Sequence, residues 1–250
     1  MLSFKNKIII ITGAASGLGL GLAIEISKRE GQLILLDIDK ERLERESKEK
    51  ILGKYETYTC DVSDLNQLKT IFSKVEKKYG HIDYLFNNAG IGGTLPFEEA
   101  TLEHWNKIIN LNIYGVINGT TAIVPIMKKQ KYGYIINTSS IAGLMPFKGQ
   151  TLYNTTKYAI TGFSLTLGKE LENENIKVSI ICPGMIKTRI FYKPIIGNEA
   201  PEEYVKIPKE AITVEEAVKD ILKGIDRNKK IIITPRFLKK IYWMYKHFGE

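Results

Sequence analysis

Short apolar runs alternate with amphipathic segments along most of this chain, and this alternation constrains the fold more than any other feature. The runs are rich in Ile, Leu and Val and resemble strands that are buried on both faces. Strands are expected at 8–12, 33–37, 55–60, 84–87, 134–138, 178–182 and 231–234. Helices are expected at 17–29, 41–51, 65–78, 102–127, 152–172 and about 213–226. Strict alternation predicts an α/β fold with a doubly wound parallel sheet and helices on both faces.

The 250 residues suit one large α/β domain, and 44% of them are hydrophobic, which is enough for a substantial core. We find no internal repeat and no linker, so residues 1–250 are expected to form a single domain. Residues 189–211 interrupt the alternation and hold three of the eight prolines. We expect this segment to be a loop over the carboxyl edge of the sheet.

The positive charge of the chain is concentrated near its end. Residues 219–250 hold nine Lys or Arg and three acidic residues, a net charge of +6 out of +8 for the whole chain. The nearly balanced remainder argues against a nucleic-acid-binding face. Cys60 and Cys182 lie in expected strands, which favours reduced thiols and a cytoplasmic protein. The three histidines lack metal-ligand spacing, and neither a signal peptide nor a transmembrane helix is predicted.

A glycine-rich turn, Thr12-Gly13-Ala14-Ala15-Ser16-Gly17-Leu18-Gly19, follows the first expected strand and opens the first expected helix. Glycines there allow close approach of a ligand to the backbone, and the N–H groups of a helix start favour a pyrophosphate. Taken alone, these glycines fit an ordinary tight turn equally well. Their place between a strand and a helix favours a dinucleotide site.

Asp37 ends the second expected strand, where an acid can accept hydrogen bonds from an adenosine ribose. Its charge would repel a 2′-phosphate, which favours NAD over NADP. Ser16 and Ile38 are not basic, although Lys40 and Arg42 are near enough in sequence to keep NADP open. The alternative role for Asp37 is a turn or a helix cap.

Tyr153 and Lys157 lie four residues apart on an expected helix, so they share one face. A phenol titrates near ~10, and a neighbouring ammonium favours the phenolate. Such a pair suits a general acid/base. Ser140, thirteen residues before Tyr153, is placed to hold a carbonyl or alcohol oxygen beside it. The alternative is a half-buried tyrosine beside a solvated lysine.

Taken together, these motifs resemble those of the short-chain dehydrogenase/reductase family in its compact subgroup. The resemblance extends from about residue 4 to residue 235 and implies a Rossmann-type sheet. Further matching segments are Asp61-Val62, Asn87-Asn88-Ala89-Gly90, Asn112, Asn137–Gly143 and Pro183–Thr188.

The resemblance also implies roles for individual residues. Tyr153 would transfer the proton, Ser140 would position the substrate oxygen, and Lys157 would bind the nicotinamide ribose and lower the pKa of Tyr153. Asn112 would hold a water in a proton relay, although an asparagine in a helix more often bonds to backbone. The implied cofactor contacts are Gly13, Ser16, Gly17, Leu18, Gly19, Asp37, Asp61, Val62, Asn88, Ala89, Gly90, Tyr153, Lys157, Pro183, Gly184, Ile186 and Thr188.

The predicted function is therefore an NAD(P)-dependent oxidoreductase that interconverts a secondary alcohol and a ketone, with NAD preferred to NADP. One alternative is an NADPH-dependent 3-oxoacyl-type reductase. An alternative of another class is an inactive cofactor-sensing or membrane-associated binding protein. The family resemblance implies a homodimer or homotetramer, and nothing indicates a metal.

Two segments bear on the partners of the protein. Apolar side chains at 190–196, 144–147, 91 and 95 predict a lipophilic substrate, with lid packing or a subunit contact as the alternative. Residues 237–250 are expected to form a basic amphipathic helix. Such a helix suits either a peripheral membrane contact or packing on protein.

Overall fold

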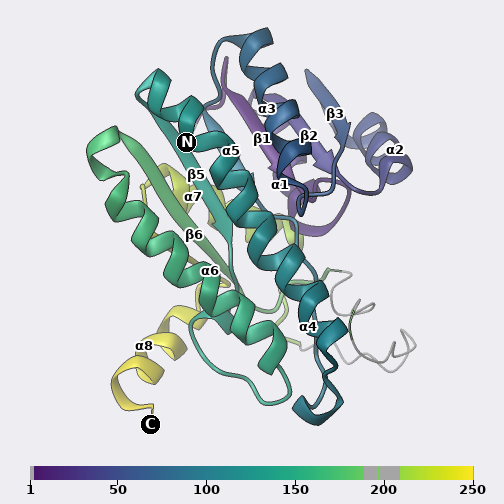
Figure 1. Cartoon of the computed structure of the whole chain (residues 1–250). Helices are drawn as coiled ribbons and strands as arrows, with labels where there is room; N and C mark the ends of the chain where they lie inside the picture. The colour runs from purple at the N-terminus through teal and green to yellow at the C-terminus, as the bar shows by residue number, and fades with distance from the viewer. Residues whose placement is uncertain (1–2, 189–195, 197–208, 250) are drawn as a thin grey trace.

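The protein is described by a computed structural model over residues 3–188, 196 and 209–249. Seven parallel strands form one sheet in the order β3-β2-β1-β4-β5-β6-β7 (Figure 1). This arrangement confirms the predicted doubly wound sheet. The strands are β1 (Ile8–Thr12), β2 (Gln32–Asp37), β3 (Tyr55–Thr59), β4 (Tyr84–Asn87), β5 (Gly133–Thr138), β6 (Ile176–Pro183) and β7 (Ile231–Thr234).

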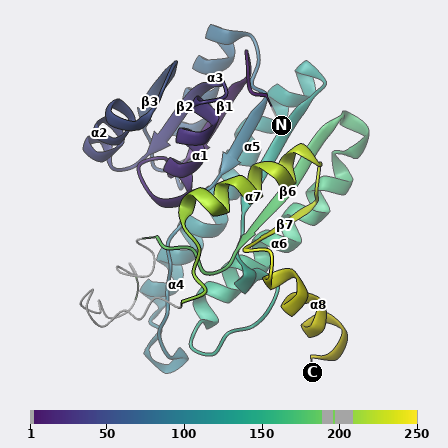
Figure 2. The same ribbon diagram turned by 180° about the vertical axis from the view of Figure 1, so that it is seen from behind.

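Helices cover both faces of the sheet, as Figures 1 and 2 show from opposite sides. One face carries α1 (Gly17–Ser27) and α7 (Val214–Asp226), which pack against each other. The other face carries α3 (Leu65–Tyr79), α5 (Gly115–Gln130) and α6 (Thr151–Glu170). The shorter helix α2 (Lys40–Lys50) follows β2, and Leu43 is its contribution to the core.

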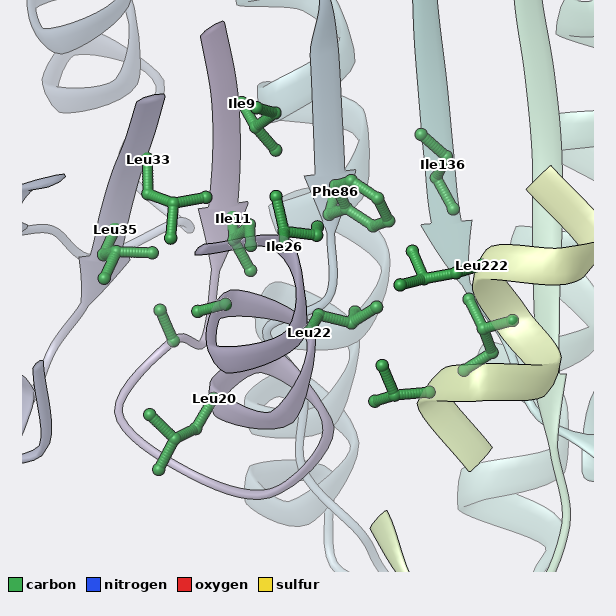
Figure 3. Packing of buried hydrophobic residues seen from close by; sticks show 14 of the residues in the cluster. Ile9, Ile11, Leu20, Leu22, Ile26, Leu33, Leu35, Phe86, Ile136 and Leu222 are labelled. Atoms are coloured by element: carbon green, nitrogen blue, oxygen red, sulfur yellow. The ribbon is translucent and has the colours of Figure 1, made fainter. Parts of the chain in front are cut away.

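The alternating side chains of each strand divide the core into two layers. Ile9 and Ile11 of β1 pack toward α1, whereas Ile8 and Ile10 pack toward α3 and α5. Figure 3 shows the first layer, where Leu22 of α1 and Leu222 of α7 meet the strands. Each fully buried Ile or Leu contributes about 1.5–3 kcal/mol. Strands that are buried on both faces are therefore continuous apolar runs in the sequence.

The expected helix at 102–127 is divided into three parts. The structure has α4 (Leu102–Ile109), a π-helical turn η2 (Asn110–Tyr114) and then α5. The wider turn accompanies the burial of Asn112, whose side chain bonds to the chain after β4. The chain stays helical through this turn and no Gly or Pro lies within it, so the sequence did not reveal the division. The other expected elements differ from the observed ones by no more than three residues at an end.

The last helix, α8 (Leu238–Phe248), confirms the expected tail helix and packs at the carboxyl end of β7. Leu238, Tyr242 and Tyr245 contact a cluster that η3 (Ile141–Gly143), β6 and β7 help to form. Within the described part of the chain, no helix is long and apolar enough to cross a membrane. Most of the expected loop at 189–211 lies outside the described residues.

Candidate active site

The carboxyl ends of the parallel strands all reach the same edge of the sheet. The strand order reverses between β1 and β4, and a crevice at such a switch point is where open α/β sheets bind ligands. The segments that follow β1, β2, β4, β5 and β6 carry the residues that the sequence singled out. The topology therefore brings motifs distant in sequence to one edge.

The glycine-rich turn provides a backbone cradle at this edge. Gly13 has a φ of +67° and Gly17 a φ of +53°, both in the left-handed region that favours glycine. A Cβ on Gly19 would lie 2.1 Å from the Gly13 carbonyl oxygen, so any side chain there would force the turn apart. Ser16 precedes α1 and makes no side-chain cap bond, which leaves the N-terminal N–H groups of α1 uncapped by it. This geometry fits a pyrophosphate.

The turn after β4 is fixed against the glycine-rich turn. The Asn88 side chain donates to the carbonyl oxygens of Thr12 (3.1 Å) and Gly13 (3.4 Å). In return, the Thr12 hydroxyl oxygen accepts from the backbone N–H groups of Asn88 (2.9 Å) and Ala89 (3.0 Å). Thr12 therefore holds the turn after β4 in place. The glycine-rich motif contains Thr12, but the sequence analysis found no role for it. Its only sequence signal is its position at the end of β1.

Asp37 lies at the end of β2, beside the glycine-rich turn. One oxygen of its carboxylate accepts from the backbone N–H of Ala15 (2.9 Å), and the other accepts from that of Asp39 (3.1 Å). Asp37 therefore shapes this loop and is itself only partly buried. The sequence left two roles open for Asp37, stabilising a turn and binding a ribose. The backbone bonds of Asp37 are compatible with both.

Asp61 and Val62 lie just after β3, at the far end of the crevice. The Asp61 carboxylate accepts from the Ser63 backbone N–H (2.9 Å) and hydroxyl (2.7 Å). Asn118 of α5 holds this turn by donating to the carbonyl oxygens of Val62 (3.1 Å) and Ser63 (2.9 Å). No sequence pattern indicated this role for Asn118.

Ser140, Tyr153 and Lys157 converge at the start of α6. Lys157 Nζ lies 5.5 Å from the Tyr153 ring centroid and donates to the Thr138 carbonyl oxygen at 3.1 Å. Ser140 Oγ donates to the Pro183 carbonyl oxygen (3.2 Å) and accepts from the Ala142 N–H (3.1 Å). Ser140 also lies close enough to Tyr153 to lower the pKa of its phenol. Ser140 precedes η3, whereas Tyr153 and Lys157 lie on α6, so two elements bring the three side chains together.

Burial controls the protonation of this group. Burial raises the pKa of the Tyr153 phenol above its usual value, and the nearby Ser140 opposes that rise. Burial also lowers the pKa of Lys157 to about 8, against a weaker opposing effect of Cys182. The resemblance implied a lowered pKa for Tyr153. In the protein without cofactor the direction is opposite, because desolvation outweighs the other interactions.

Asn112 is buried, and its side chain bonds to the chain after β4 and to α6. Its side-chain oxygen accepts from the Ile91 N–H (2.8 Å). Its amide nitrogen donates to the Ile91 carbonyl oxygen (2.9 Å) and to the Thr156 hydroxyl (3.2 Å). The side chain thus joins α6 to the chain after Gly90, as the alternative of bonding to backbone anticipated.

Asn154 is a further residue that sequence reasoning missed. It lies buried between Tyr153 and Lys157 on α6. Its amide nitrogen donates to the carbonyl oxygens of Ala142 (2.6 Å) and Met145 (2.9 Å). These bonds tie the segment after Ser140 to the helix that carries Tyr153. An asparagine inside a helix was the only available signal.

The segment after β6 reaches back to the glycine-rich turn. The Thr188 side chain lies 3.7 Å from where a Cβ on Gly17 would be. Ile186 is buried and pairs with Ile212 in an isolated bridge. A Cβ on Gly184 would lie 2.0 Å from the Leu238 side chain of α8. The structure thus places Pro183–Thr188 between the glycine-rich turn and α8.

The apolar side chains expected at the substrate mouth separate into different environments. Ile91 and Leu95 pack with Leu152, and Tyr153 borders their cluster. Leu144 and Met145 are buried in the cluster under α8. Pro146 and Phe147 line a surface pocket with Thr155 and Tyr158 instead. The lid residues 190–195 fall outside the described residues, whereas Ile196 is buried beside Leu152.

Comparison with known proteins gives consistent matches. A family model described as short chain dehydrogenase matches residues 7–194. The chain is 40% identical over 186 residues to a 3-oxoacyl-[acyl-carrier-protein] reductase of Thermotoga maritima, which covers 74% of this chain and 76% of the relative.

Solved structures agree over nearly the whole chain. A short chain dehydrogenase/reductase of Burkholderia phymatum in complex with NAD is similar with a TM-score of 0.87 and 25% identity, over 98% of this chain and 95% of that one. A short-chain dehydrogenase of Sphingobium yanoikuyae in complex with NADPH gives 0.82 and 27%, over 96% and 92%.

Proposed function

The chain belongs to the short-chain dehydrogenase/reductase family and is an oxidoreductase, and we propose that it interconverts a secondary alcohol and a ketone with Tyr153 as the acid/base. The observation that carries this proposal is the convergence of Ser140, Tyr153 and Lys157 beside the turn that follows β4. A Cβ on Gly90 would lie 3.6 Å from Lys157 Nζ, so this turn passes directly over the lysine.

The bound nicotinamide supplies or accepts the hydride, and the protein supplies position and proton transfer. In the direction of reduction, the Tyr153 hydroxyl gives its proton to the developing alkoxide, and Ser140 orients that oxygen by a hydrogen bond. Lys157 carries the nearby positive charge, which stabilises the phenolate that remains. Asn112 acts as a positioning residue, since its bonds to Ile91 and Thr156 hold the two sides of this site together.

Substitution of Tyr153 by Phe tests the proposal. The variant keeps the ring but has no transferable proton, so kcat is expected to fall by ~10²–10⁴-fold. The dissociation constant for NADH, measured by quenching of protein fluorescence, is expected to change little. Wild-type turnover in Tyr153→Phe would refute the role of Tyr153. Turnover by the wild-type enzyme on a carbonyl panel would exclude the inactive sensor alternative.

We propose NAD(H) as the preferred cofactor, held by the glycine-rich turn, Asp37, Asp61-Val62, Asn88–Gly90, Lys157 and Pro183–Thr188. The Asp37 carboxylate next to Ala15 supports this preference, because it would repel a 2′-phosphate. The related solved structures include both an NAD and an NADPH complex. The ratio of kcat/KM for NADH to that for NADPH measures the preference, and a ratio below one would refute it.

The proposed substrate is lipophilic. Support comes from Ile91, Leu95 and Leu152, which form an apolar wall beside Tyr153. A series of secondary alcohols of increasing chain length, assayed with NAD, is expected to show a rising kcat/KM as more apolar surface is buried. A preference for small polyols would refute this substrate class.

A second candidate is the reduction of a 3-oxoacyl thioester. The relative from Thermotoga maritima, 40% identical, carries that activity in its name and favours this candidate. Reduction of acetoacetyl thioesters with NADPH, faster than with NADH, would support it against the alcohol dehydrogenase proposal. A homodimer or homotetramer remains a prediction, and light scattering measures it.

A further inference from the structure

Helix α8 has two apolar faces, and the described residues of the chain cover only one of them. Leu238, Tyr242 and Tyr245 pack on the cluster that joins η3, β6 and β7. A second set of side chains recurs at spacings of four, three and four residues and therefore forms a single stripe. This α8 stripe consists of Phe237, Ile241, Met244 and Phe248, which are 42%, 45%, 49% and 76% exposed.

The free end of α8 is aromatic. Trp243 is 54% exposed, and its ring lies 4.7 Å from that of His247 and 5.9 Å from that of Phe248, between centroids. Exposed aromatic rings with a polar edge suit a boundary between an apolar and a wet phase. Figures 1 and 2 show α8 projecting from the body of the protein next to α6. A flat partner can therefore reach it.

The charged side chains of α8 itself are all basic. The helix contains Lys239, Lys240 and Lys246 and no acidic residue. Burial lowers the pKa of Lys239, the neighbouring Lys229 lowers it further, and Asp220 opposes the shift. Asp220 is also paired with Arg236, which precedes α8, at 2.6 Å. Helix α8 therefore carries a net positive charge.

We propose that the α8 stripe and its lysines form a docking surface for an anionic lipid bilayer. The stripe would enter the boundary between headgroups and acyl chains, and the lysines would lie near the lipid phosphates and anionic headgroups. A second copy of this chain is the competing occupant of the α8 stripe. The net positive charge of α8 favours an anionic surface over another copy of the same basic helix.

The docking surface adjoins the catalytic crevice. Leu238 contacts the cluster that contains Leu144 and Met145, which follow Ser140. A bilayer bound at α8 would therefore lie near the segment that follows Ser140, on the side of the site where a lipophilic substrate is proposed to react. This last step rests on the proposed function, whereas lipid binding itself does not.

Vesicle flotation tests the proposal without any assay of turnover. The whole protein is mixed with vesicles of phosphatidylcholine alone or with added phosphatidylglycerol. We expect binding that requires phosphatidylglycerol and weakens as salt is added. Replacing Lys239, Lys240 and Lys246 by Gln is expected to weaken binding at least ~tenfold. Replacing Ile241, Met244 and Phe248 by Gln is expected to weaken it by at least ~tenfold as well.

Matched variants control for lost charge and lost apolar surface. Lys48, Lys69 and Lys77 changed to Gln remove the same charge elsewhere, and Leu52, Phe97 and Leu102 changed to Gln remove exposed apolar side chains elsewhere. Both controls are expected to bind like the wild-type protein, with unchanged circular dichroism in all variants. The proposal is overturned if wild-type protein does not float with anionic vesicles, or if either α8 variant binds normally. It is also overturned if the variants halve the molecular mass in light scattering without affecting lipid binding, which would make the stripe a subunit interface.

Discussion

At the residue scale, Lys157 shows how a functional group opposes stability. The residue is 5% exposed and its pKa is lowered from 10.5 to about 8 by burial. A displacement of that size corresponds to on the order of 3 kcal/mol for charging the folded protein. This cost is consistent with the proposed role of the ammonium beside Tyr153.

Replacing Lys157 by Met is therefore expected to raise the free energy of unfolding at pH 7 by about 1–3 kcal/mol while it abolishes turnover. Below pH 8 the lysine is protonated in both the folded and the unfolded states, so the penalty is complete. Between about pH 8 and 10.5 only the unfolded state keeps the proton, so the wild-type protein gains stability as pH rises. Urea unfolding should show the difference between variant and wild type shrinking over that range.

Lys129, which is exposed and paired with Glu76, provides the control. Lys129→Met should show no such pH-dependent difference. A constant difference for Lys157→Met across the range would contradict a lowered pKa at Lys157.

Residue types and spacing indicated the pairing of Tyr153 with Lys157, because helical geometry places such residues on one face. They did not indicate the contacts of Thr12 and Asn154. These two act through backbone carbonyl and N–H groups of distant segments. Such partners have no sequence signature, so only the folded chain reveals them.

At the scale of elements, the site depends on how closely η3 approaches α6. A Cβ on Gly143 would lie 2.3 Å from Ser139 Oγ and 2.5 Å from the Lys157 carbonyl oxygen. Ser139 Oγ itself donates to that carbonyl oxygen at 2.8 Å. The glycine thus permits the contact that sets Ser140 beside Tyr153.

Gly143→Ala is expected to push η3 from α6, lower the free energy of unfolding by about 1–3 kcal/mol and reduce kcat. Gly162→Ala is the matched control, because Gly162 lies on α6 and a Cβ there would have nothing within 4 Å. It is expected to stabilise the protein by roughly 0.5–1 kcal/mol. Thermal unfolding and steady-state kinetics measure both variants, and equal stability for the two would refute the contact.

The elements themselves were largely predictable, because continuous Ile and Leu runs report strands buried on both faces. The π-helical turn at Asn110–Tyr114 was not, since the chain stays helical through it and no Gly or Pro lies within it. It contains the buried Asn112, whose partners only the tertiary structure supplies.

At the scale of the whole molecule, the crevice is assembled from both halves of the sheet. The glycine-rich turn follows β1, Asp37 ends β2, and the turn with Asn88 follows β4 on the other side of the reversal. Cofactor binding is therefore coupled to folding of the entire sheet. The alternation of strands and helices in the sequence predicted a parallel sheet. The turns that face each other are set by the order of the strands in that sheet, which the structure shows.

A saturating dinucleotide should stabilise the protein globally. At a concentration 100 times its dissociation constant, NADH should add about 2.7 kcal/mol to the free energy of unfolding. For a chain of this size, that gain should raise Tm by roughly 5–10 °C. Tyr153→Phe should show the same shift, because the phenol is not required for binding. The absence of a shift with NADH and with NADPH at millimolar concentration would contradict the assignment of the crevice.

The contact between Gly184 and Leu238 has a consequence for genetics. Any side chain at position 184 would collide with the tail helix as well as alter the turn after β6. A genetic screen for variants without turnover should recover substitutions of Gly184. Their effect would be attributed only to the turn that contacts the cofactor. The same alleles should also misplace α8, so one codon can produce two phenotypes. Second-site suppressors that shorten Leu238 should restore one phenotype and leave the other.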